Sequence, residues 1–464
     1  MAGSAAIGLA VAVGAVAAAG PWDAGQRTAE RSAAAARDRA RQPAYSISIT
    51  TLPPGAVPPS LPNTTQSPAP TAAPVLLPVP EGTAAPAAKA DPLAARLDPL
   101  MAAPALGPVT TGAVIDVASG QLLYGHRADV TSTPASTTKL ATAVAALGTL
   151  GPDARLTTTV VSTGANRIVL VGGGDPTLEL TGLADDTAAA LKARGQRSVA
   201  LGYDTSYFAG PSLHPIGHNE NLSPVTALMV DEGRLDKSTE GPAQRAFDPA
   251  SAAAESFAEL LRARGITVAG TPGPARGAGG SRLAVHQSAP LSELVERMLT
   301  YSDNDLAEAL ARQTARAAGL PAGFSGGAQA IAGALRKYGV PLGKAVFADG
   351  SGLDHVDALA PVTLARLLAL IADPRHPELA PILTGLPIAG FTGTLATRFR
   401  GTPGAGVVRA KTGTLTGTNT EAGLTVSPTG RLLAFAFMTQ GAPAPNPAQS
   451  ALDALTSALS TPSR

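Results

Sequence analysis

Ser136 and Lys139 are the first residues of the chain whose types and spacing suggest catalysis. They lie in the stretch TSTPASTTKLATAVAALG, residues 131–148, where the serine precedes the lysine by three positions. Positions i and i+3 share one face of a helix, so the hydroxyl and the amine are expected side by side. Because the residues after the lysine are mostly alanine, valine and leucine, we expect this helix to be buried. Burial lowers the pKa of a lysine, and a neutral lysine is a base that can activate a serine hydroxyl.

The start of this helix is also visible in the sequence. Pro134 suits a first helical turn, where its missing N–H costs nothing, and Thr133 is a candidate cap directly before it. A second interpretation stays open on this stretch alone, because Ser-x-x-Lys is common by chance. Under it, Ser136 is a capping residue and Lys139 is a surface lysine with a buried stem.

Two further motifs follow in order along the chain. Residues 301–304, Tyr-Ser-Asp-Asn, interrupt a long helical pattern, so a second serine and an amide are predicted on a short loop between helices. Residues 411–414, Lys-Thr-Gly-Thr, lie in a β-rich region, and their glycine is expected to let a ligand approach the backbone. The order Ser-x-x-Lys, Ser-x-Asn, Lys-Thr-Gly is typical of penicillin-binding proteins and class A β-lactamases.

Longer stretches narrow this resemblance. Ser136 and Ser302 are 166 positions apart (302 − 136), which is too far for a compact class A β-lactamase and predicts a large insertion between the motifs. The chain resembles the D-alanyl-D-alanine carboxypeptidases of peptidase family S13, the penicillin-binding protein 4 type, from about residue 91 to its end. The stretches that carry this resemblance are LVGGGDPTL (170–178), ENLSPVTALMVDEGR (220–234), ADGSGLD (348–354) and LPIAGFTGTLATRF (386–399).

The resemblance implies roles for individual residues. Its four catalytic residues are Ser136, Lys139, Ser302 and Asn304, and its four substrate-binding residues are Lys411, Thr412, Gly413 and Thr414. Ser136 would form an acyl-enzyme, Lys139 would accept its proton, and Ser302 would relay a proton to the leaving amine. Asn304 would hold the substrate amide and the lysine, while Lys411 would bind the terminal carboxylate. The backbone N–H groups of Ser136 and Thr414 would form the oxyanion hole.

Three functions are compatible with these motifs. The preferred one is a serine D-Ala-D-Ala carboxypeptidase, with endopeptidase activity left open, which acts on peptidoglycan peptides and is inhibited by β-lactams. A β-lactamase of the same fold is the first alternative, although no segment matches the deacylating glutamate of class A enzymes. A non-catalytic sensor of cell-wall fragments or β-lactams is the second, and the complete catalytic set argues against it. We expect no cofactor and no metal.

The elements that must position these residues predict an α+β fold. Residues 111–127 read as a β-hairpin with a Ser119–Gly120 turn, and three antiparallel strands follow between residues 406 and 440. With the helical segments between them they indicate a penicillin-binding protein/β-lactamase-like transpeptidase domain, an antiparallel sheet flanked by helices plus a helical part. Two strands are predicted between 155 and 178, after which the pattern is irregular. We expect the penicillin-binding domain at 91–160 and 289–464, with an inserted region at 161–288.

The N-terminal part has a different composition. Residues 1–22 contain an uncharged apolar stretch, which predicts a signal or membrane anchor, although the arginines that follow it oppose the orientation of an exported enzyme. Residues 23–90 read as a Pro/Ala-rich disordered linker, with twelve prolines between Pro43 and Pro86. We therefore expect an extracytoplasmic protein in the cell envelope, either anchored or secreted. The net charge of +1 gives no reason to expect nucleic acid as a partner.

Several other residues invite a functional interpretation. Ser325 sits in a G-x-S-x-G pattern, but a helix precedes it, so we expect a loop rather than a nucleophile elbow. His214 and His218 are separated by Pro215 and Gly217, which argues against a metal site on one helix. Asp303 receives no role. For Asp349, Ser351 and Asp354 (residues of the ADGSGLD stretch), structural and functional roles both stay open.

Overall fold

The computed structural model describes residues 93–236 and 238–462, which belong to one compact unit, residues 83–464. The predicted N-terminal anchor, 1–22, and linker, 23–90, lie outside the described residues. Within the part that is described, no helix has the length and apolar character needed to cross a membrane.

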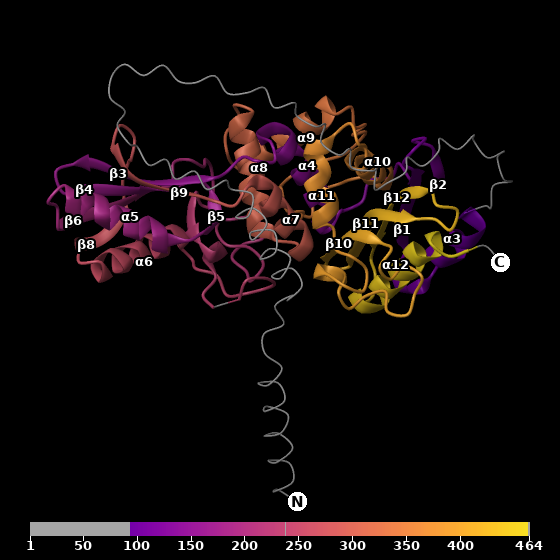
Figure 1. Ribbon diagram of the computed structural model, residues 1–464. Helices are drawn as coiled ribbons and strands as arrows, with labels where there is room; N and C mark the ends of the chain where they lie inside the picture. The colour runs from indigo at the N-terminus through magenta and orange to yellow at the C-terminus, as the bar shows by residue number, and fades with distance from the viewer. Residues whose placement is uncertain (1–92, 237, 463–464) are drawn as a thin grey trace, which may run out of the picture. The chain divides into compact units, whose positions relative to one another are not determined.

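The central sheet joins the two ends of the described chain (Figure 1). Its five strands run in the order β10-β11-β12-β1-β2, all antiparallel. Their bounds are β1 Val109–Asp116, β2 Leu122–His126, β10 Arg409–Leu415, β11 Thr418–Val426 and β12 Leu432–Gln440. The predicted antiparallel sheet, with its hairpin and its three C-terminal strands, is confirmed.

Alanine and phenylalanine alternate in β12, so one face of this sheet carries small side chains and the other carries large ones. Successive strand residues point to opposite faces. Ala434 and Ala436 therefore join the core made with the central helices, whereas Phe435 and Phe437 join a second core with the terminal helices. The terminal helices are α3 Leu93–Met101 and α12 Pro445–Leu459.

The small alanine face lets a helical layer approach closely. The helix α4, Thr138–Leu150, is buried at every position from 138 to 147, which its alanine-rich sequence permits. The other elements of this layer are α7 Leu291–Tyr301, α8 Asn304–Ala317, α9 Phe324–Lys337, α10 Pro361–Ile371, η4 Pro377–Leu379 and α11 Ala380–Gly385. Ser325 lies in the first turn of α9, so the predicted loop is wrong there. The preceding element is a helix, as expected.

The part of the chain between the first and second motifs forms a second five-stranded sheet, drawn at the left of Figure 1. Its order is β8-β6-β4-β3-β9; β4, β6 and β8 pair in parallel, and β3 pairs antiparallel with both neighbours. Its elements are β3 Thr157–Gly164, β4 Arg167–Val171, α5 Leu180–Ala193, β6 Ser198–Asp204, α6 Pro249–Ala263, β8 Thr267–Pro274 and β9 Ser281–Gln287. The expectation of an irregular pattern after 178 is wrong, because α5 and β6 are regular. The predicted limits of the inserted region stay a prediction.

A small parallel pair completes this region. It consists of β5 Asp175–Leu178 and β7 Leu228–Val230, and the turn η3, Asp231–Gly233, follows it. The remaining short turns are η1 Pro104–Leu106, η2 Ala135–Thr137 and η5 Gly393–Leu395.

Candidate active site

The first motif lies where η2 runs into α4. Ser136 is in η2, and Lys139 is the second residue of α4. The Lys139 Nζ lies 3.0 Å from Ser136 Oγ, and the lysine is fully buried. The two side chains therefore lie side by side, as their spacing predicts, and the lysine is not a surface residue.

The turn that carries Ser136 is held differently from the sequence expectation. Pro134, rather than Thr133, occupies the N-cap position, and no side chain caps the turn. Instead, the Pro134 carbonyl accepts hydrogen bonds of 2.7 Å from the Thr137 and Thr420 hydroxyls, so strand β11 anchors the turn. Ala135 has a φ of +49°, a left-handed conformation that is costly for alanine and that only surrounding contacts can maintain.

Lys139 has three oxygen neighbours. Besides Ser136 Oγ, these are Asn304 Oδ1 at 2.6 Å and the backbone carbonyl of Ser351 at 2.7 Å. Burial lowers the pKa of Lys139 to about 8, against the opposing effect of nearby carboxylates, chiefly Asp349 and Glu308. A lysine with this pKa is substantially neutral at mildly alkaline pH.

The Ser351 carbonyl is held by a buried acidic layer. Glu308 Oε1 accepts hydrogen bonds from the Gly350 and Ser351 N–H groups at 3.0 and 2.8 Å. Asp349 accepts the N–H of Gly352 at 2.6 Å. A Cβ on Gly352 would lie 2.0 Å from the Ala135 carbonyl oxygen, so the glycine lets this loop pack on the turn that carries Ser136. The structure thus gives Ser351 a backbone contact with the site.

The second motif faces the third. Ser302 follows the last residue of α7 in a left-handed conformation, with φ +60°, and α8 begins at Asn304, so the predicted short loop is present. Lys411 on β10 donates hydrogen bonds to Ser302 Oγ at 2.9 Å and to the Thr412 carbonyl at 2.6 Å. Burial, followed by repulsion from Lys139, holds the pKa of Lys411 well below its usual range.

Strand β10 forms one edge of the central sheet and contacts the turn η2. The Thr412 hydroxyl donates to Thr394 Oγ1 at 2.8 Å, and Thr414 is exposed. A Cβ on Gly413 would lie 2.8 Å from the Pro134 carbonyl oxygen. Close packing of β10 on the turn beside Ser136 therefore requires this glycine, in addition to the ligand approach that the sequence suggests.

A cleft of about 680 Å³ opens over these groups. Five of the eight predicted site residues line it: Ser136, Ser302, Asn304, Thr412 and Thr414. Lys139, Lys411 and Gly413 lie buried behind this surface. The inserted region contributes a wall of the cleft through Asn221, Arg234, Glu240, Gly241, Pro242 and Arg245.

Sequence reasoning missed several neighbours of the site. The Asn221 carbonyl accepts a 2.9 Å hydrogen bond from Asn304 Nδ2, and the Ser351 carbonyl accepts one from Lys139. Both contacts are made by the backbone, so no side-chain type marks them in the sequence. Thr394 and Glu308 lie outside the three motifs. Glu308 accepts backbone N–H groups of the ADGSGLD stretch, so the glycines of that stretch were a usable signal for a tightly packed loop beside it. His214 and His218 have separate surroundings: His214 Nε2 lies 3.0 Å from Asp349 Oδ2, and His218 Nε2 donates to the Arg245 carbonyl at 3.0 Å.

The chain matches the D-Ala-D-Ala carboxypeptidase 3 (S13) family over residues 93–246 and 236–459. It is 36% identical to carboxypeptidase DacB of Mycolicibacterium smegmatis over 427 residues, 87% of this chain and 90% of the relative. It is also 36% identical to a carboxypeptidase of Mycobacterium tuberculosis over 409 residues, 83% of this chain and 86% of the relative.

Solved structures support the same fold. Penicillin-binding protein 4 of Haemophilus influenzae superposes with a TM-score of 0.66 at 24% identity, covering 78% of this chain and 97% of that chain. The same protein is also known in complex with a β-lactam. The predicted α+β fold of the penicillin-binding protein/β-lactamase type is confirmed. The chain belongs to the D-Ala-D-Ala carboxypeptidase 3 (S13) family and is a serine-type carboxypeptidase.

Proposed function

We propose that this enzyme cleaves the terminal D-Ala-D-Ala bond of peptidoglycan stem peptides through an acyl-enzyme on Ser136. One observation carries the proposal: the buried amine of Lys139 lies within hydrogen-bond distance of Ser136 Oγ and of two further oxygens that are acceptors only. When the lysine is neutral, this arrangement leaves the lone pair of its amine directed at the Ser136 hydroxyl.

The hydrogens of the Lys139 amine determine which neighbour its lone pair faces. A neutral lysine amine has two N–H bonds and one lone pair. The Asn304 side-chain oxygen and the Ser351 carbonyl can only accept, so they take the two N–H bonds. The lone pair then faces Ser136 Oγ and accepts its proton as the oxygen attacks the substrate carbonyl carbon.

Ser302 and Lys411 serve the second half of acylation. The tetrahedral intermediate collapses by breaking its C–N bond, and the leaving D-alanine nitrogen needs a proton. Ser302 Oγ passes a proton to that nitrogen and regains one from the Lys411 amine, which lies 2.9 Å away. Water then attacks the acyl ester and loses a proton to Lys411 through Ser302, while Lys139 returns its proton to Ser136 Oγ.

The oxyanion of the intermediate needs donors on the opposite side of the attacked carbon. We assign this role to the backbone N–H groups of Ser136 and Thr414. Each such donor is worth about 3–4 kcal/mol of transition-state stabilisation. The left-handed backbone at Ala135 sets the direction of the Ser136 N–H, which gives the strained turn a function.

Lys411, Thr412, Gly413 and Thr414 are the proposed binding strand for the substrate. The cation of Lys411 and the two threonine hydroxyls suit a terminal carboxylate. A β-lactam carries a carboxylate and a reactive amide in a similar arrangement, and a related penicillin-binding protein 4 binds one. We therefore expect penicillin to acylate Ser136 and to act as an inhibitor.

Peptidoglycan lies outside the cytoplasmic membrane, so the enzyme is extracytoplasmic. Whether residues 1–22 are retained as a membrane anchor or removed as a signal is decided by the N-terminal mass of the mature protein. Retention of the apolar stretch in a membrane fraction supports anchoring.

The direct test is release of D-alanine from a pentapeptide ending in D-Ala-D-Ala. Ser136→Ala removes the nucleophile and is expected to abolish release, while Thr416→Ser, at the rim of the same cleft, should retain it. Release by Ser136→Ala at the parent rate would refute the proposal. A cross-linked dimer as a second substrate reports any endopeptidase activity.

A further inference from the structure

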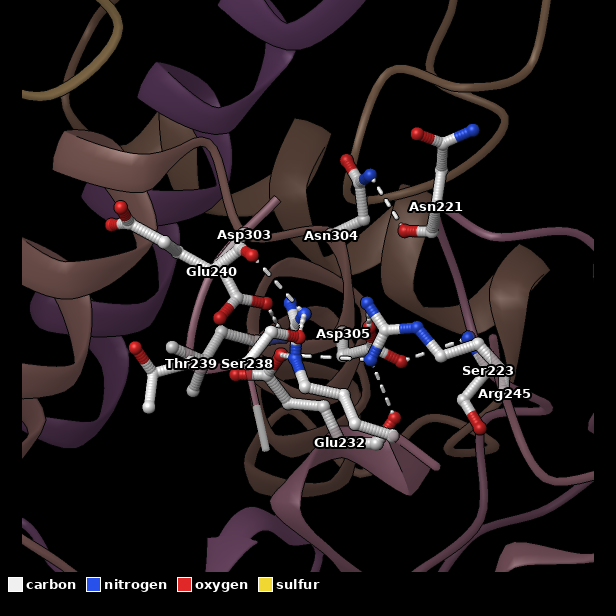
Figure 2. A network of polar contacts seen from close by, with 12 residues as sticks. Asn221, Ser223, Glu232, Ser238, Thr239, Glu240, Arg245, Asp303, Asn304 and Asp305 are labelled. Atoms are coloured by element: carbon white, nitrogen blue, oxygen red, sulfur yellow. Dashed lines mark hydrogen bonds and ion pairs between the residues drawn. The ribbon is translucent and has the colours of Figure 1, made fainter. Parts of the chain in front are cut away.

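The inserted region contacts three consecutive residues where the Ser-x-Asn loop runs into α8, Asp303 to Asp305 (Figure 2). Carboxylate oxygens of Asp303 and Glu232 lie within 4.8 Å of one another, and Arg297 contacts both groups. Asn304 Nδ2 donates to the Asn221 carbonyl at 2.9 Å. Asp305 accepts the Ser223 N–H at 3.0 Å. Each residue from 303 to 305 is thus tied to a segment that precedes the loop by 60 or more positions.

One of these contacts fixes the orientation of an amide. The Asn221 carbonyl can only accept, so the Asn304 NH₂ group must face it. The Asn304 oxygen is then left facing Lys139, at 2.6 Å. The backbone of the inserted region therefore determines which end of the amide the lysine meets.

The charges around the loop balance one another. Three carboxyl groups (Glu232, Asp303 and Asp305) lie among three guanidinium groups (Arg234, Arg245 and Arg297). Arg234 lies 2.9 Å from Glu232, Arg245 lies 3.3 Å from Asp305, and Arg297 contacts both Glu232 and Asp303. The arginines supply the positive charge that this acidic group needs, and a buried network of this kind is costly to break on one side.

Strain in the backbone points to the same residue. Asp231, Glu232 and Gly233 have φ values of +46°, +55° and +66°. Two successive non-glycine residues in this region are unfavourable and persist only where the surroundings enforce them. Here the strained turn places the Glu232 side chain, 1% exposed, among the arginines and beside Asp303.

We propose that Glu232, together with Arg245, is a positioning residue through which the inserted region holds the Ser-x-Asn loop, so that Asn304 stays on Lys139. This inference rests on the proposed function of those two residues. It gives the inserted region a part in catalysis beyond its place in the cleft wall. The proposal also assigns a role to Asp303, the middle residue of the motif, which connects the loop to Glu232.

The pH profile separates this role from a purely structural one. Burial, followed by the charge of Glu232, raises the pKa of Asp303 to about 7, and the charge of Asp303 in turn raises the pKa of Lys139. In Glu232→Gln the charge of Asp303 remains, so the Lys139 limb of the rate profile should stay near its parent position while the rate falls. Asp303→Asn removes the charge itself, so the limb should move to lower pH. The charged groups facing Asp303 are Glu232, Arg297, Asp305 and Lys139.

The test measures the acylation rate constant with fluorescent penicillin between pH 6 and 10 on the full chain. Glu232→Gln should slow acylation roughly ten- to a hundred-fold through misplacement of Asn304. The exposed Glu259→Gln in the same region is the matched control and should equal the parent. A folded Glu232→Gln protein with the parent rate would overturn the inference.

Asp303→Asn keeps the inference testable if Glu232→Gln does not fold. Asparagine also accepts a hydrogen bond at the N-cap of α8, so the loop should remain folded. An unmoved profile in this variant contradicts the inference. Acylation of Ser136→Ala, by contrast, would refute the proposed function itself, so the two failures are distinguishable.

Discussion

The side-chain amine of Lys139 donates a 2.7 Å hydrogen bond to the backbone carbonyl of Ser351, 212 positions further along the chain. This contact supplies the acceptor that the Ser-x-x-Lys and Ser-x-Asn motifs do not contain. With Asn304 Oδ1 it occupies two of the three directions around the amine. The third direction is the one toward Ser136, so the nucleophile meets the lone pair whenever the lysine is neutral.

The pH dependence of acylation follows from this arrangement. Lys139 must be neutral to accept the Ser136 proton, and burial lowers its pKa to about 8. The acylation rate should therefore rise with pH up to about 8 and then level off. Stopped-flow acylation at saturating penicillin across pH 6–10 measures this. A rate that is flat or falls through this range would contradict Lys139 as the base.

The packing of the Gly352 loop on the turn beside Ser136 predicts a stability effect. Gly352 has a φ of +82°, and a Cβ there would lie 2.0 Å from the Ala135 carbonyl oxygen. Gly352→Ala should destabilise the fold by at least about 1–3 kcal/mol and also slow acylation. Gly333 in α9 is a matched control, since a Cβ there meets nothing within 4 Å.

Gly333→Ala should stabilise the protein by about 0.5–1 kcal/mol, because alanine is the better helix residue. Chemical denaturation of both variants gives the comparison. Equal unfolding free energies for the two variants would show that the loop does not need its glycine.

Substrate binding should take up a proton at Lys411. Burial and the neighbouring Lys139 hold the pKa of Lys411 well below its usual range. An arriving carboxylate favours the charged form and raises that pKa, so the complex binds more protons than the free enzyme. Binding should then weaken as the pH rises.

Titration calorimetry in two buffers of different ionisation enthalpy, with the Ser136→Ala protein and a D-Ala-D-Ala peptide, counts this proton. A peptide with an amidated C-terminus is the control and should lack the uptake. Equal uptake with both peptides would remove Lys411 from carboxylate recognition.

Much of the site is predictable because its chemistry requires particular side chains at particular spacings. Ser136 and Lys139 are adjacent for helical reasons, and the two other motifs bring Asn304 and Lys411 to them. The carbonyls of Ser351 and Asn221 are different, since any residue carries the same backbone group. Their part in the site depends on how distant segments pack, which the sequence does not display.

The fold, too, is predictable where a local sequence pattern marks an element and unpredictable where distant segments pair. The alternation of Ala434, Phe435, Ala436 and Phe437 marks a strand with two buried faces. In the inserted region, α5 buries alanines and leucines in a polar context, and β6 pairs in parallel with strands far along the chain. Such non-local pairing leaves a weaker local pattern, which explains why the region after 178 looked irregular.

The most direct measurement is mass spectrometry of the full chain after incubation with penicillin, followed by peptide mapping. We expect one added penicillin mass, located on the peptide that contains Ser136, and no addition to Ser136→Ala. An adduct on a different residue, or an unchanged adduct on Ser136→Ala, would contradict this expectation.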